Sequence, residues 1–144
     1  MIRLMKDTSG EIDNIMAIWL SSTIQAHDFI SEEYWNKSYD LVKNTYLPQS
    51  ETYVYTENGD ILGFISIINK EFIGALFIKR EYQGKGIGKE LIEFVKSHYD
   101  VLSLAVYKEN KDAVNFYINR GFKSISEQLN EDTNEPEYIM SING

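Results

Sequence analysis

The strongest sign of chemistry in this sequence is a run of glycines at alternate positions, Gly84, Gly86 and Gly88. An apolar stretch at residues 72–78, typical of a strand, precedes them, and a helical pattern follows at residues 89–99. Glycines let consecutive backbone N–H groups converge on one point, and a helix that begins there adds free N–H groups and a partial positive charge. With Lys85 and Lys89 beside the glycines, the segment predicts a phosphate-binding turn.

The same segment excludes two common nucleotide-binding patterns. A Walker A loop with Gly88 and Lys89 as its G-K pair would need glycine in place of Gln83 and Ser or Thr in place of Glu90. A dinucleotide fingerprint that started at Gly84 would need a glycine where Lys89 stands. Neither a nucleoside triphosphate nor a dinucleotide is therefore favoured as the phosphate-bearing ligand.

A second pattern, N-x-x-A-x-x-F-Y-x-x-x-G-F, lies at residues 110–122. Asn110 suits the start of a helix, because its side chain can accept a hydrogen bond from a free backbone N–H group. Ala113 has a small side chain that lets another group approach the helix closely. Phe116 and Tyr117 follow Ala113 by three and four positions, so all three share one helix face.

Together with the hexad Q-G-K-G-I-G at residues 83–88, this second pattern resembles the GCN5-related N-acetyltransferase (GNAT) family. In that family the Gln-x-x-Gly-x-Gly signature lies between the fourth strand and the third helix and binds the pyrophosphate of acetyl-CoA. The resemblance implies acetyl-CoA as the cofactor, no metal, and cofactor contacts from Leu76, Phe77, Ile78, Gln83, Gly84, Lys85, Gly86, Ile87, Gly88, Lys89, Asn110, Ala113 and Phe116. It covers nearly the whole chain, and residues 19–35 and 138–141 resemble small bacterial members, some of which acetylate protein lysines.

The resemblance also implies roles in the transfer reaction. The family tyrosine that matches Tyr117 lies near the thioester sulfur, so we expect Tyr117 to be the general acid that protonates the departing thiolate. We expect the strand before the glycines to be bulged and to splay from its neighbour, so that its backbone holds the pantetheine arm and polarises the carbonyl. Because the chain has no cysteine, we expect direct attack by the amine in a ternary complex.

The general base stays open among several candidates. His27 titrates near neutrality and lies in the break between the first two helices, which borders the acceptor site in the family. Glu71 begins the strand that leads to the cofactor, and Glu137 lies beside the last strand. A base that acts through a water molecule is an equal alternative.

We expect the acceptor to be a primary amine, on either a protein lysine or a small molecule. Residues 127–137 include several acidic side chains and no basic one, and an aromatic cluster is expected from Phe29, Tyr34 and Trp35. Both features would suit a cationic acceptor. A non-catalytic module that senses CoA is the alternative from another functional class; Tyr117 favours the enzyme, because a sensor needs no proton donor.

The elements that must position these residues follow from hydrophobic periodicity. Helices are predicted at about residues 9–25, 32–47, 89–99 and 111–120, and strands at about 2–6, 52–56, 61–68, 72–78, 101–106, 122–128 and 138–142. The order βααβββαβαββ predicts an α/β (α+β) domain with a GNAT-like acyl-CoA N-acyltransferase fold. We expect one domain over residues 1–144, with a mixed, mostly antiparallel sheet of about seven strands and about four helices.

Composition narrows the function classes further. The chain has 144 residues, a formal net charge of −8 and no cysteine, which excludes disulfides, cysteine-ligated metals and an acyl-cysteine enzyme. The acidic balance argues against nucleic acid and anionic membranes as partners. The apolar runs are short and no secretory signal is recognised, so we expect a cytoplasmic protein. The sequence leaves open whether it is a monomer or a homodimer.

Overall fold

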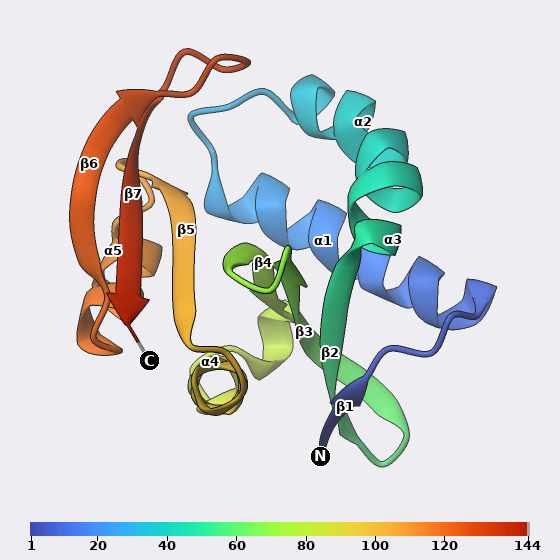
Figure 1. Ribbon diagram of the computed structural model, residues 1–144. Coiled ribbons are helices and arrows are strands. Elements are labelled where there is room, and N and C mark those ends of the chain that lie inside the picture. The colour runs from blue at the N-terminus through green and yellow to red at the C-terminus, as the bar shows by residue number, and fades with distance from the viewer. Residues whose placement is uncertain (144) are drawn as a thin grey trace.

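The computed structural model describes residues 1–143 (Figure 1). Its elements are β1 (Ile2–Leu4), α1 (Ser9–Ala26), α2 (Glu32–Leu41), the π-helix η1 (Val42–Tyr46), α3 (Leu47–Gln49), β2 (Ser50–Glu57), β3 (Asp60–Ile68), β4 (Phe72–Ile78), the 3₁₀ turn η2 (Arg80–Tyr82), α4 (Ile87–His98), β5 (Val101–Tyr107), α5 (Lys111–Asn119), β6 (Lys123–Leu129) and β7 (Pro136–Asn143). The predicted order of strands and main helices is confirmed. The short segments η1, α3 and η2 were not predicted.

A seven-stranded sheet organises the chain in the order β1-β2-β3-β4-β5-β7-β6. Every neighbouring pair is antiparallel except β4 and β5, so the predicted mixed, mostly antiparallel sheet is confirmed. The parallel register between β4 and β5 consists of one pair, Phe72 with Ser103. Beyond that pair the two strands diverge, as the resemblance implied.

Strand β4 carries the expected bulge. Its register with β3 passes from Ile67 opposite Ile73 to Ser66 opposite Ala75, which leaves Gly74 as the extra residue. A bulge bends its strand and increases the local twist. The bulge therefore accompanies the separation of β4 from β5, at the position where the cofactor-binding strand was expected to splay.

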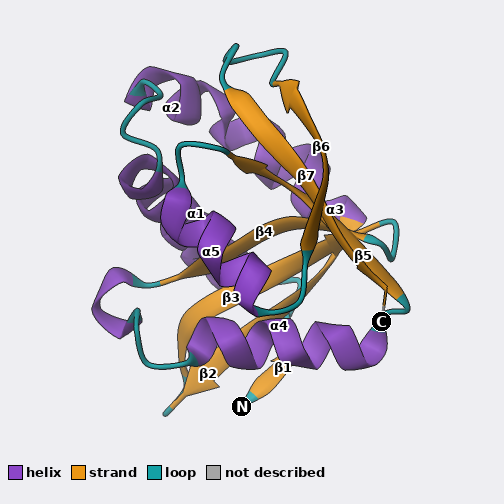
Figure 2. Ribbon diagram, turned by 90° about the vertical axis from the view of Figure 1, so that its left-hand side faces the viewer, coloured by secondary structure: helices purple, strands orange, loops and turns teal. Residues whose placement is uncertain are grey.

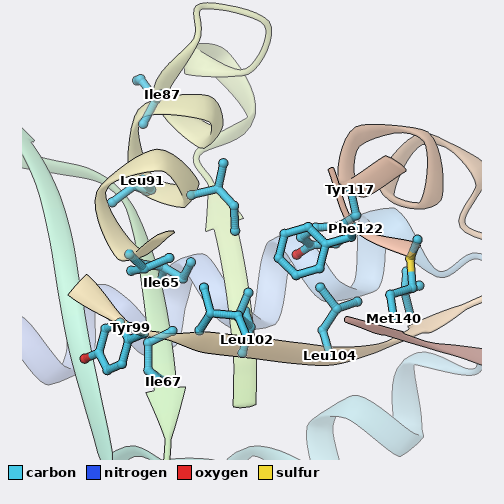
Figure 3. Packing of buried hydrophobic residues seen from close by; sticks show 14 of the residues in the cluster. Ile65, Ile67, Ile87, Leu91, Tyr99, Leu102, Leu104, Tyr117, Phe122 and Met140 are labelled. Carbon is cyan, nitrogen blue, oxygen red and sulfur yellow. The ribbon is translucent and has the colours of Figure 1, made fainter. Parts of the chain in front are cut away.

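Two apolar cores lie on opposite faces of the sheet. On one face Leu91 and other buried residues of α4 pack against Ile65 and Ile67 of β3, and Tyr117 of α5 lies beside Phe122 (Figure 3). On the other face Met16 and its neighbours in α1 pack with residues of α2, α3, β2 and β3. The sheet is thus covered on both sides, and β4 and β5 separate between the two layers.

Local capping explains where the first helices begin. The Thr8 side chain accepts a hydrogen bond from the Glu11 backbone N–H group at 3.3 Å, and Ser31 does the same for Tyr34 at 3.4 Å. The Glu11 carboxylate does not complete a capping box, because it binds the Arg3 guanidinium at 2.8 Å. The helical run that begins with α2 continues without a break through η1 and α3 and ends at Gln49, one residue after Pro48, so the predicted end of the second helix near residue 47 is confirmed.

Within residues 1–143, none of the helices combines the length and the apolar character needed to cross a lipid bilayer.

Candidate active site

A cavity of about 530 Å³ opens where β4 and β5 separate. It is bounded by α1, α2, β4, β5, α5 and the loop that leads into α4. The predicted site residues that line it are Leu76, Phe77, Ile78, Gln83, Gly88, Asn110, Ala113, Phe116, Tyr117 and His27. The divergence of two parallel strands therefore brings residues from both sequence motifs to one place.

The glycine-rich loop lies at one end of this cavity, and Figure 2 shows it leading from β4 past η2 into α4. Gly84 and Gly86 have φ angles of 78° and 86°, a left-handed conformation that residues with a Cβ atom rarely adopt. No side chain caps α4, so backbone N–H groups at its start are available to an anion. A Cβ atom built on Gly84 or Gly86 would meet nothing within 4 Å, so the loop has open space beside it.

The two motifs meet at Gly88. A Cβ atom there would lie 3.6 Å from the Phe116 ring, so the first turn of α4 packs against α5. The Gln83 side chain donates a hydrogen bond to the Ile78 carbonyl at 3.1 Å, which fixes the exit from β4. The other loop residues do not line the cavity: the Ile87 side chain is buried under α4, and Lys85 lies over the Tyr82 ring.

Tyr117 lies in the middle of the cavity wall, on α5. Its ring makes edge contacts with Phe116 and Phe122, at centroid distances of 5.3 and 5.5 Å. Burial alone raises the pKa of the Tyr117 hydroxyl above its usual value. The hydroxyl therefore stays protonated at neutral pH and can donate a proton.

His27 ends α1 at the opposite end of the cavity and is 7% exposed. Its Nδ1 atom lies 2.8 Å from the Thr23 carbonyl oxygen, which can only accept, so Nδ1 carries the proton in the neutral ring. Its Nε2 atom, 3.4 Å from Asn110 Nδ2, then has the lone pair. Burial lowers the pKa of His27, and its bond to Thr23 opposes this shift, so the ring is neutral at pH 7 and its Nε2 lone pair faces the Asn110 amide group, which also lines the cavity.

The two carboxylates expected as alternative bases do not line the cavity. Glu71 is exposed in the turn before β4, where β4 and β5 are still paired, and its carbonyl accepts a hydrogen bond from the Ser103 N–H group. Glu137 is buried on β7, and its carboxylate accepts hydrogen bonds from Gln128 at 2.9 Å and Asn130 at 3.4 Å. Both positions follow from the way the strands pair. The sequence patterns predicted the strands but not the register between them.

Aromatic rings surround His27. The ring centroids of Trp35, Tyr107 and Phe29 lie 5.2, 5.1 and 5.8 Å from its own. Phe29 and Trp35 were predicted to cluster, whereas Tyr107 was missed. Its position offered a signal, because it ends β5, and the carboxyl ends of parallel strands commonly border ligand sites.

The acidic loop between β6 and β7 meets α2 beside this aromatic group. The Tyr34 hydroxyl donates a hydrogen bond to Asp132 at 3.3 Å. Burial raises the pKa of Tyr34 to about 12, with help from the negative charge of Asp132, so the hydroxyl remains a donor. Glu127 forms an ion pair with Lys108 at 3.4 Å, so only part of the acidic run faces the aromatic group. Among residues 1–143, no cluster of three or more His, Asp or Glu side chains could hold a metal ion.

Comparisons with known proteins agree with this geometry. The family model described as an acetyltransferase (GNAT) domain matches residues 6–134. Peptidyl-lysine N-acetyltransferase YiaC of Escherichia coli strain K12 is 37% identical over 132 residues, which cover 92% of this chain and 90% of YiaC.

Solved structures give the same fold. The solution structure of apo-form YjaB from Escherichia coli has a TM-score of 0.82 at 30% identity, over 98% of this chain and 97% of that one. PaiA N-acetyltransferase from Thermoplasma acidophilum, solved in complex with coenzyme A, has a TM-score of 0.77 at 21% identity, over 100% of this chain and 99% of that one. At that identity the second likeness concerns the fold alone.

Proposed function

The chain belongs to the GNAT acetyltransferase family, and from this premise we propose that it transfers an acetyl group from acetyl-CoA to the side-chain amine of a protein lysine. The observation that carries the proposal is the continuity of one cavity. It runs from Gly88 at the start of α4, past Tyr117, to His27 and its aromatic neighbours.

The glycine-rich loop suits the pyrophosphate of the cofactor. Gly84 and Gly86 leave open space where side chains would otherwise stand, and the uncapped start of α4 offers N–H groups and a partial positive charge. Leu76, Phe77 and Ile78 would hold the pantetheine arm through the backbone edge of β4 that β5 leaves unpaired. When bound, acetyl-CoA supplies an acetyl group activated as a thioester.

Two side chains would accept and donate the protons of the transfer reaction. A lysine amine must lose a proton as its nitrogen bonds to the acetyl carbon, and the sulfur must gain one as the carbon–sulfur bond breaks. We assign His27 Nε2 as the acceptor of the first proton, because His27 is neutral at pH 7 and lines the cavity. We assign the Tyr117 hydroxyl as the donor of the second, because its raised pKa keeps it protonated.

The acceptor end favours a cation. Trp35, Tyr107 and Phe29 offer aromatic rings beside His27, and Asp132 adds a carboxylate at the junction of α2 with the β6–β7 loop. Such surroundings attract a lysine side chain and orient it by its charge and its apolar stem. The name of YiaC, a peptidyl-lysine N-acetyltransferase, supports a peptide lysine over other amines.

The test is a screen of acceptors with the purified chain and acetyl-CoA, followed by thiol release and by mass spectrometry of the acceptor. We expect acetylation of lysine peptides and none of the same peptides with the lysine amine already blocked. Transfer only to polyamines or aminoglycosides would overturn the lysine assignment. Tight CoA binding without turnover of any acceptor would replace the enzyme by a CoA-sensing module.

A further inference from the structure

A second cavity, of about 340 Å³, lies on the α1 face of the sheet. It is bounded by α1, η1 and α3 on one side and by β2, β3 and β4 on the other, and it is not closed, because its lining residue Tyr46 is 47% exposed; none of its lining residues is charged. Met16 and Phe64 in its wall are at most 1% exposed. This cavity plays no part in the reaction described above.

The two serine hydroxyls that line this cavity already have partners. The Ser50 hydroxyl donates a hydrogen bond to the Leu47 carbonyl at 2.8 Å, and the Ser66 hydroxyl is 2.8 Å from that of Thr52. A ligand group that entered would therefore find apolar walls and satisfied hydroxyls. Moving from water into such surroundings is favourable for an apolar group and unfavourable for a polar group, which would find no hydrogen-bonding partner.

The second cavity adjoins the main one through β4 and α1. Both are lined by Trp19, Gly74 and Ala75. On the β4 side the shared wall consists of the two smallest residues, at and beside the bulge. A group held against β4 at the bulge in the main cavity is therefore separated from the apolar cavity by Gly74, Ala75 and the Trp19 ring.

We propose that this apolar cavity seats the alkyl end of acyl groups longer than acetyl, so that the chain also uses thioesters such as butyryl-CoA. The proposal rests on the proposed function, in which the thioester lies along β4. The amine would approach from His27 and Tyr107, neither of which lines the second cavity. The acyl chain is consequently the part of the reactants that faces Gly74 and Ala75.

The first measurement is the affinity of the unmodified chain for acetyl-CoA, butyryl-CoA and hexanoyl-CoA by isothermal titration calorimetry, without an acceptor. Burial of one methylene is worth about a fourfold gain in affinity, and butyryl-CoA has two more methylenes than acetyl-CoA, so it should bind about fifteenfold tighter. Equal or weaker binding of butyryl-CoA would overturn the inference and leave acetyl transfer untouched. Failure to bind or turn over any thioester would instead overturn the proposed function.

The second measurement fills the cavity from η1. Val42 is half-buried and lines only the second cavity, so Val42→Phe should abolish the preference for butyryl-CoA while acetyl-CoA binds as before. Leu41→Phe is the matched control, because Leu41 is the neighbouring residue, 50% exposed and outside both cavities. A change in lysine-peptide KM with no change in acyl preference would assign the cavity to the acceptor. If Val42→Phe does not fold, the affinities of the unmodified chain still decide the question.

Discussion

The Nε2 atom of His27 and the Nδ2 atom of Asn110 lie 3.4 Å apart, so the end of α1 and the start of α5 meet at the cavity. Asn110 also caps α5, because its Oδ1 atom accepts a hydrogen bond from the Ala113 N–H group at 3.3 Å. With Oδ1 committed to the cap, the amide NH₂ group faces His27. The Thr23 carbonyl holds the other ring nitrogen, so the tautomer of His27 is set from two sides.

The pH dependence of the rate should reveal the ionisation of His27. If its Nε2 atom takes the proton of the amine, kcat/KM should rise with pH through a limb whose pKa lies below the ordinary value of His, because burial lowers the pKa of this ring. His27→Gln should lower kcat by at least about 100-fold and remove that limb. Rates measured from pH 5 to 9 test this. An unchanged limb in the variant would assign the base to another group.

Stability should also depend on pH through His27. The unfolded chain binds a proton more readily than the folded chain, because the folded-state pKa is the lower of the two. The contribution of neutral His27 to the free energy of unfolding is therefore fully present above the ordinary pKa of His. It is lost as pH falls through the folded-state pKa. Chemical denaturation at pH 8 and pH 5 should show a smaller loss in His27→Gln than in the unmodified chain. Parallel losses in the two proteins would contradict this assignment.

Tyr117→Phe should separate catalysis from folding. Burial alone raises the pKa of this hydroxyl, with no hydrogen-bonding partner for it among residues 1–143, so its removal should change the melting temperature little. Loss of a general acid costs about 100-fold or more in kcat. Affinity for acetyl-CoA by calorimetry should stay within about twofold, since the ring contacts with Phe116 and Phe122 remain. A variant with full activity would remove Tyr117 from the mechanism.

The carboxylate of Asp132 should select cationic acceptors. Asp132→Asn keeps the shape of the side chain that Tyr34 contacts and removes its charge. Loss of a partly exposed charge interaction is worth up to about 1 kcal/mol, so KM for a lysine peptide should rise about threefold to fivefold. KM for acetyl-CoA should not change. Glu131→Gln is the matched control, because it removes the adjacent exposed acid; an equal effect there would point to net charge alone.

Much of this arrangement could be predicted from the sequence, because local rules fix it. The glycines, the Asn110 cap and the spacing of Phe116 and Tyr117 each depend on one turn or one helix face. Each of these features depends only on residues close in the sequence, so distant contacts in the folded chain do not alter it. The resemblance to the family followed from these two motifs, and the mixed, mostly antiparallel sheet followed from the order of the elements; the order of the strands within the sheet was not predicted.

The rest depended on strand register and on contacts distant in sequence. Whether Glu71 or Glu137 reaches the cavity depends on where β4 leaves β5 and on how β6 pairs with β7. Tyr107 became part of the site only through its contact with His27, 80 positions earlier in the numbering of the chain. The π-helix η1 has no known local signal, and its Val42 forms one wall of the second cavity.

Gly86→Glu should abolish CoA binding for two physical reasons. Gly86 has a φ angle of 86°, which costs a residue with a Cβ atom about 1 kcal/mol, and a carboxylate at the start of α4 repels a pyrophosphate. Gly59→Glu, in the β2–β3 turn, carries the same charge change at a φ angle of 84°, also with nothing within 4 Å of the added Cβ atom. The two variants should lose similar stability in thermal unfolding. Only Gly86→Glu should raise the Kd for CoA, by more than about 100-fold by calorimetry. If both variants bind CoA equally well, the anion does not lie at the start of α4, and the glycine-rich loop serves only to join β4 to that helix.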